Sequence, residues 1–176
     1  MSHDLFSSLA SFDSSNSSVL LVRDVAGDYR QVDADEVLQA AQQVLLGRVR
    51  GRDVLASPQA VRDFLRVKLG ALEHEVFAVV HLDTQNRVIE YVEMFRGTVS
   101  QTSVYPREVV REAMMRNSAA LLLVHNHPSG STQPSRADEM LTQTLKTALS
   151  LVDVRVLDHL IVAGNDILSM AERGLM

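Results

Sequence analysis

The chain has 176 residues, of which 46% are hydrophobic, and it carries a formal net charge of −5. This length fits one domain with an extension, and the apolar fraction is large enough for a sizeable core. The chain contains no cysteine, which excludes disulfides, thiolate metal sites and a cysteine nucleophile, and agrees with a reducing, cytoplasmic compartment.

The charge pattern does not favour a nucleic-acid or membrane partner. The basic cluster GRVRGR at residues 47–52 is interpreted as a solvated linker, because so short a run seldom suffices for nucleic-acid binding. We expect DNA binding that is weak and salt-sensitive at most. No stretch reaches the roughly 20 apolar residues of a membrane span, and the N-terminus lacks the basic and apolar regions of a secretory signal.

The N-terminal part of the chain has the composition of an extension. Residues 1–18 are rich in serine and asparagine and are predicted to form a flexible tail. SVLLV and YRQV flank the turn-forming AGD, which predicts a hairpin. A helix should follow, with Asp33 as its N-cap and Gly47 at its end. We therefore predict a hairpin-helix extension at residues 19–53 and a main domain at residues 54–176.

Helices and strands alternate through the predicted main domain. This alternation favours an α/β fold in which helices flank a mixed β-sheet. We expect strands at 75–82, 87–95, 119–124, 154–164 and 166–170, and helices from Ser57-Pro58 to Gly70, from Pro106 to near Asn117 and from Ser135 to about Leu151.

The apolar strand AALLLV is followed directly by HNHPSGSTQPSRAD, residues 125–138. Residues i and i+2 of a strand point to the same side of the sheet. His125 and His127 therefore face one way, and Asn126 the other, if the strand continues through them. Two imidazoles together at the end of a strand can bind a borderline metal ion such as zinc.

A third ligand is available at the start of the next helix. Pro128 and Gly130 turn the chain, and Ser135 is a natural N-cap with Asp138 in the first helical turn. The carboxylate of Asp138 can point back across the loop toward the histidines. Two histidines and one aspartate leave one tetrahedral position for water, which is typical of a catalytic zinc site rather than a structural one.

Each part of this pattern also has an ordinary explanation. A His-x-His pair by itself is usually incidental, and Ser135 with Asp138 can be a capping arrangement and nothing more. The buried strand, the paired histidines, the two proline-set turns and the later aspartate are together hard to explain by capping alone. We therefore favour a metal site.

The segment HNHPSGSTQPSRAD resembles the His-x-His-Pro and Ser-x-x-Asp signature of the JAMM (MPN-type) metalloproteases, in the form found in the RadC branch. EVFAVVHLDTQNRVI, FRGTVSQTSVYPREVV, AALLLVHNHPSG and VDVRVLDHLIVAGNDILSMAERGL also resemble RadC segments, in the family's order. The resemblance covers about residues 56–176. It implies a JAMM/MPN core, which is cytidine-deaminase-like, behind a small N-terminal extension.

The resemblance implies a role for each residue of the motif. A zinc ion would be held by His125, His127 and Asp138. The general base would be a glutamate at the edge of an earlier strand, a position that Glu75 matches; the alternative is Glu73, two residues before it. Ser135 matches the family serine that stabilises the tetrahedral oxyanion, although its hydroxyl can cap the helix instead.

Three histidines outside the motif are interpreted from their surroundings in the sequence. Asp158 and His159, in LDHLIVA, form either a hydrogen-bonded structural pair or a second layer that orients a metal-bound imidazole. His74 and His81 flank the first strand of the main domain, and we interpret both as surface or edge residues.

The leading hypothesis is a zinc-dependent hydrolase of peptide or isopeptide bonds that acts on a protein or peptide substrate. The alternatives are a non-catalytic MPN-type scaffold and a DNA-repair-associated binding protein. Two-metal nucleases favour clusters of carboxylates, and this motif has one aspartate. Full-length RadC proteins carry a helix-hairpin-helix region that residues 1–50 do not show, so the chain resembles the short forms of prophages and plasmids. An edge strand near the C-terminus could pair with a second copy and give a homodimer.

Overall fold

The computed structural model describes residues 20–23, 26–49, 58–97 and 104–176. The predicted flexible tail, residues 1–18, lies outside the described residues. The chain divides into two compact units, residues 1–39 and 40–176. The division predicted from the sequence, at residues 53 and 54, stays a prediction.

The first unit contains the predicted hairpin. Strands β1 (Leu21–Arg23) and β2 (Tyr29–Gln31) pair in antiparallel orientation. Helix α1 (Ala34–Val49) follows them, and the Oδ1 atom of Asp33 accepts a hydrogen bond from the backbone N–H of Glu36 at 2.8 Å. The hairpin and the N-cap at Asp33 are therefore confirmed.

The predicted end of α1 is wrong by two residues, because the helix continues through Gly47 to Val49. Glycine ends a helix when it adopts the left-handed conformation, and Gly47 is not among the residues with a positive φ. A glycine in helical conformation lowers helix stability by about 1 kcal/mol relative to alanine but does not end the helix.

The second unit is built on a five-stranded mixed sheet with the strand order β4-β3-β5-β6-β7. Neighbouring strands are antiparallel except for the central pair β5 and β6, which are parallel. The predicted mixed α/β fold is confirmed, and β7 lies at an edge of the sheet as expected. The strands are β3 (Val76–Leu82), β4 (Val88–Arg96), β5 (Ala120–Asn126), β6 (Arg155–Ala163) and β7 (Asp166–Ser169).

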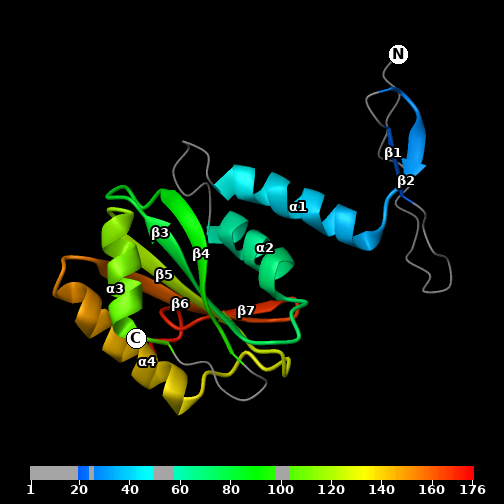
Figure 1. The fold of residues 1–176 in the computed structure, drawn as a ribbon. Coiled ribbons are helices and arrows are strands. Elements are labelled where there is room, and N and C mark those ends of the chain that lie inside the picture. Colours follow the sequence, from blue (N-terminus) through cyan, green and yellow to red (C-terminus); the bar gives the residue numbers. More distant parts are fainter. Residues whose placement is uncertain (1–19, 24–25, 50–57, 98–103) are drawn as a thin grey trace. The chain divides into compact units, whose positions relative to one another are not determined.

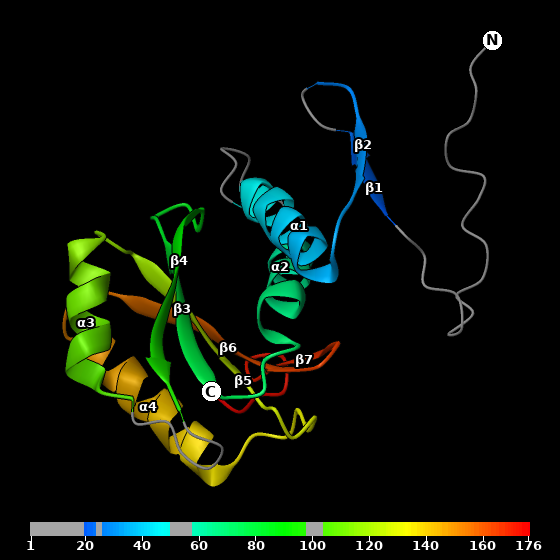
Figure 2. The ribbon, with the colours of Figure 1, turned by 45° about the vertical axis from the view of Figure 1, so that its right-hand side comes forward.

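Helices cover both faces of this sheet. Helix α2 (Pro58–Leu69) lies on one face, whereas α3 (Pro106–Met115) and α4 (Arg136–Ser150) lie on the other, as Figures 1 and 2 show from two directions. Within the described residues, no helix combines the length and the apolarity that a bilayer span would require.

Alternating side chains of the buried strands fill two separate cores. In β3, Ala78 and Val80 belong to the core beneath α2, whereas Phe77 and Val79 belong to the core beneath α3 and α4. This is the period of two that a strand imposes on a sheet covered on both faces. Full burial of an aliphatic or aromatic side chain contributes about 1.5–3 kcal/mol, so the two cores stabilise the packing of the helices on the sheet.

The end of α2 shows why a glycine is required there. The helix ends at Leu69 and Gly70 follows, as predicted. The backbone of Gly70 lies so close to the carbonyl of Gly164, in the turn between β6 and β7, that a β-carbon would overlap the carbonyl oxygen. The absence of a side chain thus allows α2 to pack closely against the sheet.

Candidate metal centre

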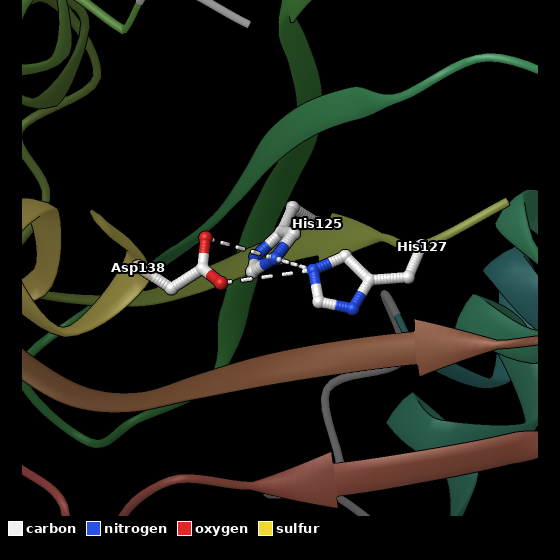
Figure 3. A group of neighbouring side chains, drawn as sticks. All are labelled: His125, His127 and Asp138. Carbon is white, nitrogen blue, oxygen red and sulfur yellow. Dashed lines mark hydrogen bonds and ion pairs between the residues drawn. The ribbon is translucent and has the colours of Figure 1, made fainter. Parts of the chain in front are cut away.

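The sheet topology brings several polar side chains to one end of β5. Because β3 runs antiparallel to β5, the start of β3 lies beside the end of β5, with Phe77 opposite His125. Helix α4 begins close to the same point. Figure 3 shows the side chains of His125, His127 and Asp138 pointing toward one another from β5, from the residue after it and from the first turn of α4.

The two histidines are placed by the strand. β5 continues through Asn126, as the interpretation of the motif required. The backbone N–H of His127 then donates to the carbonyl of Val162 in β6 at 2.8 Å, which extends the ladder by one more residue. The Nε2 atoms of His125 and His127 lie 2.8 Å apart. Beyond His127 the chain turns through Gly130, whose φ of +80° is the left-handed conformation that favours glycine.

The carboxylate of Asp138 is placed by a capping box at the start of α4. Its Oδ2 atom accepts from the backbone N–H and from the hydroxyl of Ser135, each at 2.7 Å, while the Asp138 N–H donates to the Ser135 hydroxyl at 3.2 Å. The Oδ1 atom lies 3.4 Å from His125 Nε2, and Oδ2 lies 3.7 Å from His127 Nε2. Capping therefore aims this carboxylate at the histidines, so the two functions proposed for Asp138 are compatible.

His125, His127 and Asp138 form a group that could hold a metal ion, with one ligand atom from each residue and all three atoms within 4.8 Å of one another. It is the one such group among the residues that the structure describes. His125 is buried and the other two side chains are half-buried, so the group opens toward solvent on one side.

The ring nitrogens on the far side of each imidazole also have partners. Nδ1 of His127 donates to the carbonyl of Ser131 at 2.7 Å, which leaves the lone pair of its neutral ring on Nε2. Nδ1 of His125 contacts Nε2 of His159 at 2.8 Å. Such contacts orient the imidazoles of metal sites. Two imidazole nitrogens that face each other at short range are stable only when a proton or a cation lies between them, so the donor set fits a divalent metal.

Burial and charge shift the pKa values of the group in different directions. Burial lowers the pKa of His125 to about 4. Interaction with Asp138 raises the pKa of His127, helped by the Ser131 carbonyl and by the charges of Asp138 and Glu75, against the opposing effect of burial. Burial opposes the charge of Asp138, but interaction with both histidines and with Ser135 outweighs it and holds the pKa of Asp138 well below its usual range. The carboxylate is thus ionised at neutral pH and available as a ligand.

Residues 55–175, more than half of the chain, match the family model described as the RadC-like JAB domain. The chain belongs to the RadC-like JAB domain family. The resemblance that the motif and the neighbouring segments predicted is therefore confirmed.

Relatives of this RadC-like JAB domain carry the name UPF0758 protein. The one from Leptothrix cholodnii is 56% identical over 150 residues, which are 85% of this chain and 68% of the relative. The one from Albidiferax ferrireducens is 54% identical and the one from Acidovorax sp. strain JS42 is 57% identical, over 64% and 63% of their lengths. The matched part thus spans about two thirds of each of these relatives.

In this RadC-like JAB domain, Glu75 stands one residue before β3, and the side chain of Asn126 holds the backbone on both sides of it. Oδ1 of Asn126 accepts from the N–H of Val76 at 2.7 Å, and Nδ2 donates to the carbonyl of His74 at 3.0 Å. The amide of Asn126 thereby acts like one more peptide group of the β3–β5 ladder. The sequence predicted that Asn126 faces away from the histidines but did not indicate this contact.

The surroundings of the two candidate bases differ. Glu75 is half-buried, and its charge makes the smallest of the contributions to the raised pKa of His127. Glu73 is exposed. These observations favour Glu75 over Glu73, and the catalytic role of either residue stays a prediction.

The two residues of the Asp158–His159 pair fit different interpretations. His159 fits a ring that orients a metal-bound imidazole, whereas Asp158 fits a structural, hydrogen-bonding role. His159 is buried and contacts His125, so its ring lies in the layer behind the metal group. Asp158 points elsewhere: its carboxylate accepts from the Ser169 hydroxyl and from the N–H groups of His159 and Ala171, and so supports the segment after β7. Neighbouring residues of a strand face opposite sides, so one pair serves two purposes.

The interpretation of His81 as a surface or edge residue is wrong, and that of His74 is wrong in part. His81 is fully buried, and its Nδ1 lies 2.8 Å from the Ser118 hydroxyl. His74 is half-buried. His81 lies inside a strand that is paired on both sides, and its complete burial could not be seen from the flanking sequence.

Thr142 was not predicted to belong to the site. Its hydroxyl lies 2.6 Å from Nδ1 of His159 and donates to the carbonyl of Asp138 at 2.6 Å. The sequence does contain a sign of this position, because Thr142 follows Asp138 by four residues and therefore lies on the same face of α4.

Proposed function

We propose that this RadC-like JAB domain is a zinc-dependent hydrolase of peptide or isopeptide bonds. The proposal is carried by the convergence of His125, His127 and Asp138 at a partly exposed point. Nδ1 of each imidazole contacts a further residue, which orients the ring. Imidazole and carboxylate are ligands that zinc accepts, and three protein ligands with one remaining position are typical of catalytic zinc sites. When bound, zinc lowers the pKa of a water molecule toward neutrality and polarises a carbonyl group.

The chain's own residues supply the proton transfers. Glu75 stands at the end of the sheet that carries the histidines, and its segment is held by Asn126. As general base, its carboxylate accepts a proton from the attacking water and then delivers it to the leaving amine. Glu73 remains the alternative base.

Ser135 is assigned to the stabilisation of the tetrahedral oxyanion. Its side chain is exposed beside the metal group, but its single hydroxyl proton is engaged with Asp138 Oδ2. Donation to an oxyanion therefore requires the hydroxyl to rotate away from Asp138. The backbone N–H of Ser135 still holds the carboxylate when it does so.

The first test compares Glu75→Gln with Glu73→Gln, which is a matched control two residues away. Both changes keep the size of the side chain and remove the carboxylate. Glu75→Gln should retain zinc and thermal stability but lower turnover by about 10²-fold or more, whereas Glu73→Gln should leave turnover close to that of the wild type. The measurements are metal content, thermal unfolding and hydrolysis of a library of fluorogenic peptides and lysine isopeptides.

The outcomes separate the three hypotheses. Zinc bound by the wild type without hydrolysis of any library member favours the scaffold. The reverse pattern of the two glutamine variants makes Glu73 the base. Unchanged turnover in both variants removes the general-base assignment altogether. Tight DNA binding at physiological salt would favour the DNA-associated alternative, and the binding constants should then fall steeply with added salt.

A further inference from the structure

A buried chain of hydrogen bonds runs from His125 into helix α4. Nδ1 of His125 lies 2.8 Å from Nε2 of His159, and Nδ1 of His159 lies 2.6 Å from the hydroxyl of Thr142. The same hydroxyl lies 2.6 Å from the backbone carbonyl of Asp138. His159 and Thr142 are both completely buried. The chain thus starts at one candidate metal ligand and ends at the backbone of another.

The donors and acceptors of this chain fit one arrangement of protons. A carbonyl only accepts, so the single hydroxyl proton of Thr142 points at Asp138. The Thr142 oxygen must then accept from Nδ1–H of His159. Because a neutral imidazole carries one N–H, Nε2 of His159 is an acceptor and must receive the proton on Nδ1 of His125. Nε2 of His125 is left with its lone pair, which faces Asp138 and either accepts a hydrogen-bond proton from Nε2 of His127 in the metal-free protein or binds a cation in its place.

Both rings are neutral in this account, and their burial supports that. Both rings are buried, where a charged imidazolium would lose its hydration, so each ring carries a single proton. The opposite proton order would turn the Thr142 proton toward His159 and leave two oxygens, the Thr142 hydroxyl and the Asp138 carbonyl, facing each other without a proton. The other acceptor near that hydroxyl, the sulfur of Met170 at 3.8 Å, is weak and distant.

We propose that Thr142, acting through His159, holds His125 in the tautomer whose Nε2 lone pair faces the metal centre. Thr142 is a positioning residue, because it reaches the centre only through the two rings. The inference rests on the proposed function for the identity of the metal, but the tautomer itself is a property of the metal-free protein. One turn of α4 thereby supplies the carboxylate of Asp138 and prepares the lone pair of His125.

The direct test is the tautomer of His125 in the zinc-free wild-type protein. Nitrogen-15 chemical shifts of the histidine rings, measured by long-range proton–nitrogen correlation at neutral pH, distinguish Nδ1–H from Nε2–H. We expect Nδ1–H for both His125 and His159. An Nε2–H tautomer at His125 would overturn the inference, whatever the protein binds.

The second test removes the hydroxyl. Thr142→Val keeps the branched shape of the side chain, and Thr142→Ser keeps the hydroxyl. Thr144→Val is the matched control, because Thr144 is exposed on the same helix and its hydroxyl donates to the carbonyl four residues back in the same way, at 2.8 Å. Zinc affinity is measured by competition with a chromophoric chelator, and folding by thermal unfolding without zinc.

Thr142→Val should bind zinc about 10- to 100-fold more weakly than the wild type, the usual effect of losing a group that orients a metal-bound histidine. It should also give mixed tautomers at His125. Thr142→Ser should restore both properties, and Thr144→Val should change neither. A merely structural role of Thr142 would lower thermal stability but leave the ring shifts of His125 as in the wild type.

The failures of the two proposals are distinguishable. Absence of zinc binding in the wild type would remove the proposed function and leave the tautomer measurement as the test of this inference. Zinc binding that is equal in the wild type and in Thr142→Val, with the same His125 tautomer, would overturn the inference and leave the proposed function intact. If Thr142→Val does not fold, the wild-type shifts and the Thr142→Ser variant still give the answer.

Discussion

Near each end of the central strand β5 lies a buried histidine that faces a hydroxyl group, yet among the described residues only one end gathers side chains that could hold a metal ion. At the start of β5, His81 contacts the Ser118 hydroxyl at 2.8 Å. Toward its other end, His159 contacts the Thr142 hydroxyl at 2.6 Å. Both histidines are completely buried, and burial lowers the pKa of His81 to about 4 and that of His159 to about 3.

The two ends of β5 differ in the partner of Nε2, the second ring nitrogen of each buried histidine. Nε2 of His81 has no hydrogen-bond partner within the described ranges, so the contact ends in the core. Nε2 of His159 contacts His125, whose other nitrogen faces His127 and Asp138. A buried histidine with a hydroxyl partner is therefore not a site by itself. A site requires that several donors converge where solvent can reach.

The largest effect that tests this comparison is the loss of metal. The His125→Ala/His127→Ala double variant should fall from about one zinc per chain to nearly none, because two of the three proposed ligands are gone. His81→Asn, at the other end, should keep the wild-type zinc content. Metal analysis of the purified proteins gives the result, and unchanged zinc in the double variant would contradict the ligand assignment.

Zinc should stabilise the folded chain only through the end of β5 that carries His125 and His127. A ligand that binds the folded state alone adds about 2.7 kcal/mol to the free energy of unfolding at a free concentration 100 times its dissociation constant. We expect this gain, measured by thermal or urea unfolding with and without zinc, in the wild type and in His81→Asn. The double variant should show no gain, and an equal gain in all three proteins would place the zinc elsewhere.

The pH dependence of stability should reveal His81. Its folded pKa, about 4, lies below the ordinary value near 6.5, so above pH 6.5 the ring is neutral in both states. As the pH falls from 6.5 to 4, the unfolded state binds a proton that the folded state does not. The free energy of unfolding should therefore fall, by at most about 1.4 kcal/mol per pH unit for this one group.

The control for this pH effect is His81→Asn, which cannot titrate. With zinc removed by a chelator, the free energy of unfolding of the variant should fall less steeply between pH 6.5 and 4 than that of the wild type. The two slopes should differ by at most about 1.4 kcal/mol per pH unit, the value for one proton. His125 and His159 titrate in both proteins and cancel in the difference. Equal slopes for the two proteins would mean that His81 keeps its ordinary pKa in the folded chain.

The smallest expected effect concerns the hydroxyl of Ser118, the partner of His81 near the start of β5. Ser118→Ala removes the partner of His81 and should lower the free energy of unfolding by about 1–2 kcal/mol, since one buried nitrogen is left without its hydrogen bond. Zinc affinity should stay at the wild-type value, in contrast to Thr142→Val. Chemical denaturation and chelator competition on the same samples measure the two quantities, and weaker zinc binding in Ser118→Ala would couple the two ends.

The sequence by itself determined the features that depend on neighbours along the chain. The continuous apolar run AALLLV predicted a buried strand, the prolines and Gly130 predicted the turns, and Ser135 with Asp138 predicted a helix start. The family resemblance was also present in the sequence, because its motif is a run of adjacent residues. The metal ligands themselves stay a prediction until zinc is measured.

Only the tertiary structure decided which distant residues complete the site. Asn126 meets the segment of Glu75 because β3 and β5 are antiparallel neighbours, and His159 meets His125 because β5 and β6 are parallel neighbours. Neither pairing can be derived from local periodicity, since the residue pattern of one strand does not indicate which strand lies beside it. The same reason explains the error at His81: burial is set by the strands and helix that cover a residue, and these come from elsewhere in the chain.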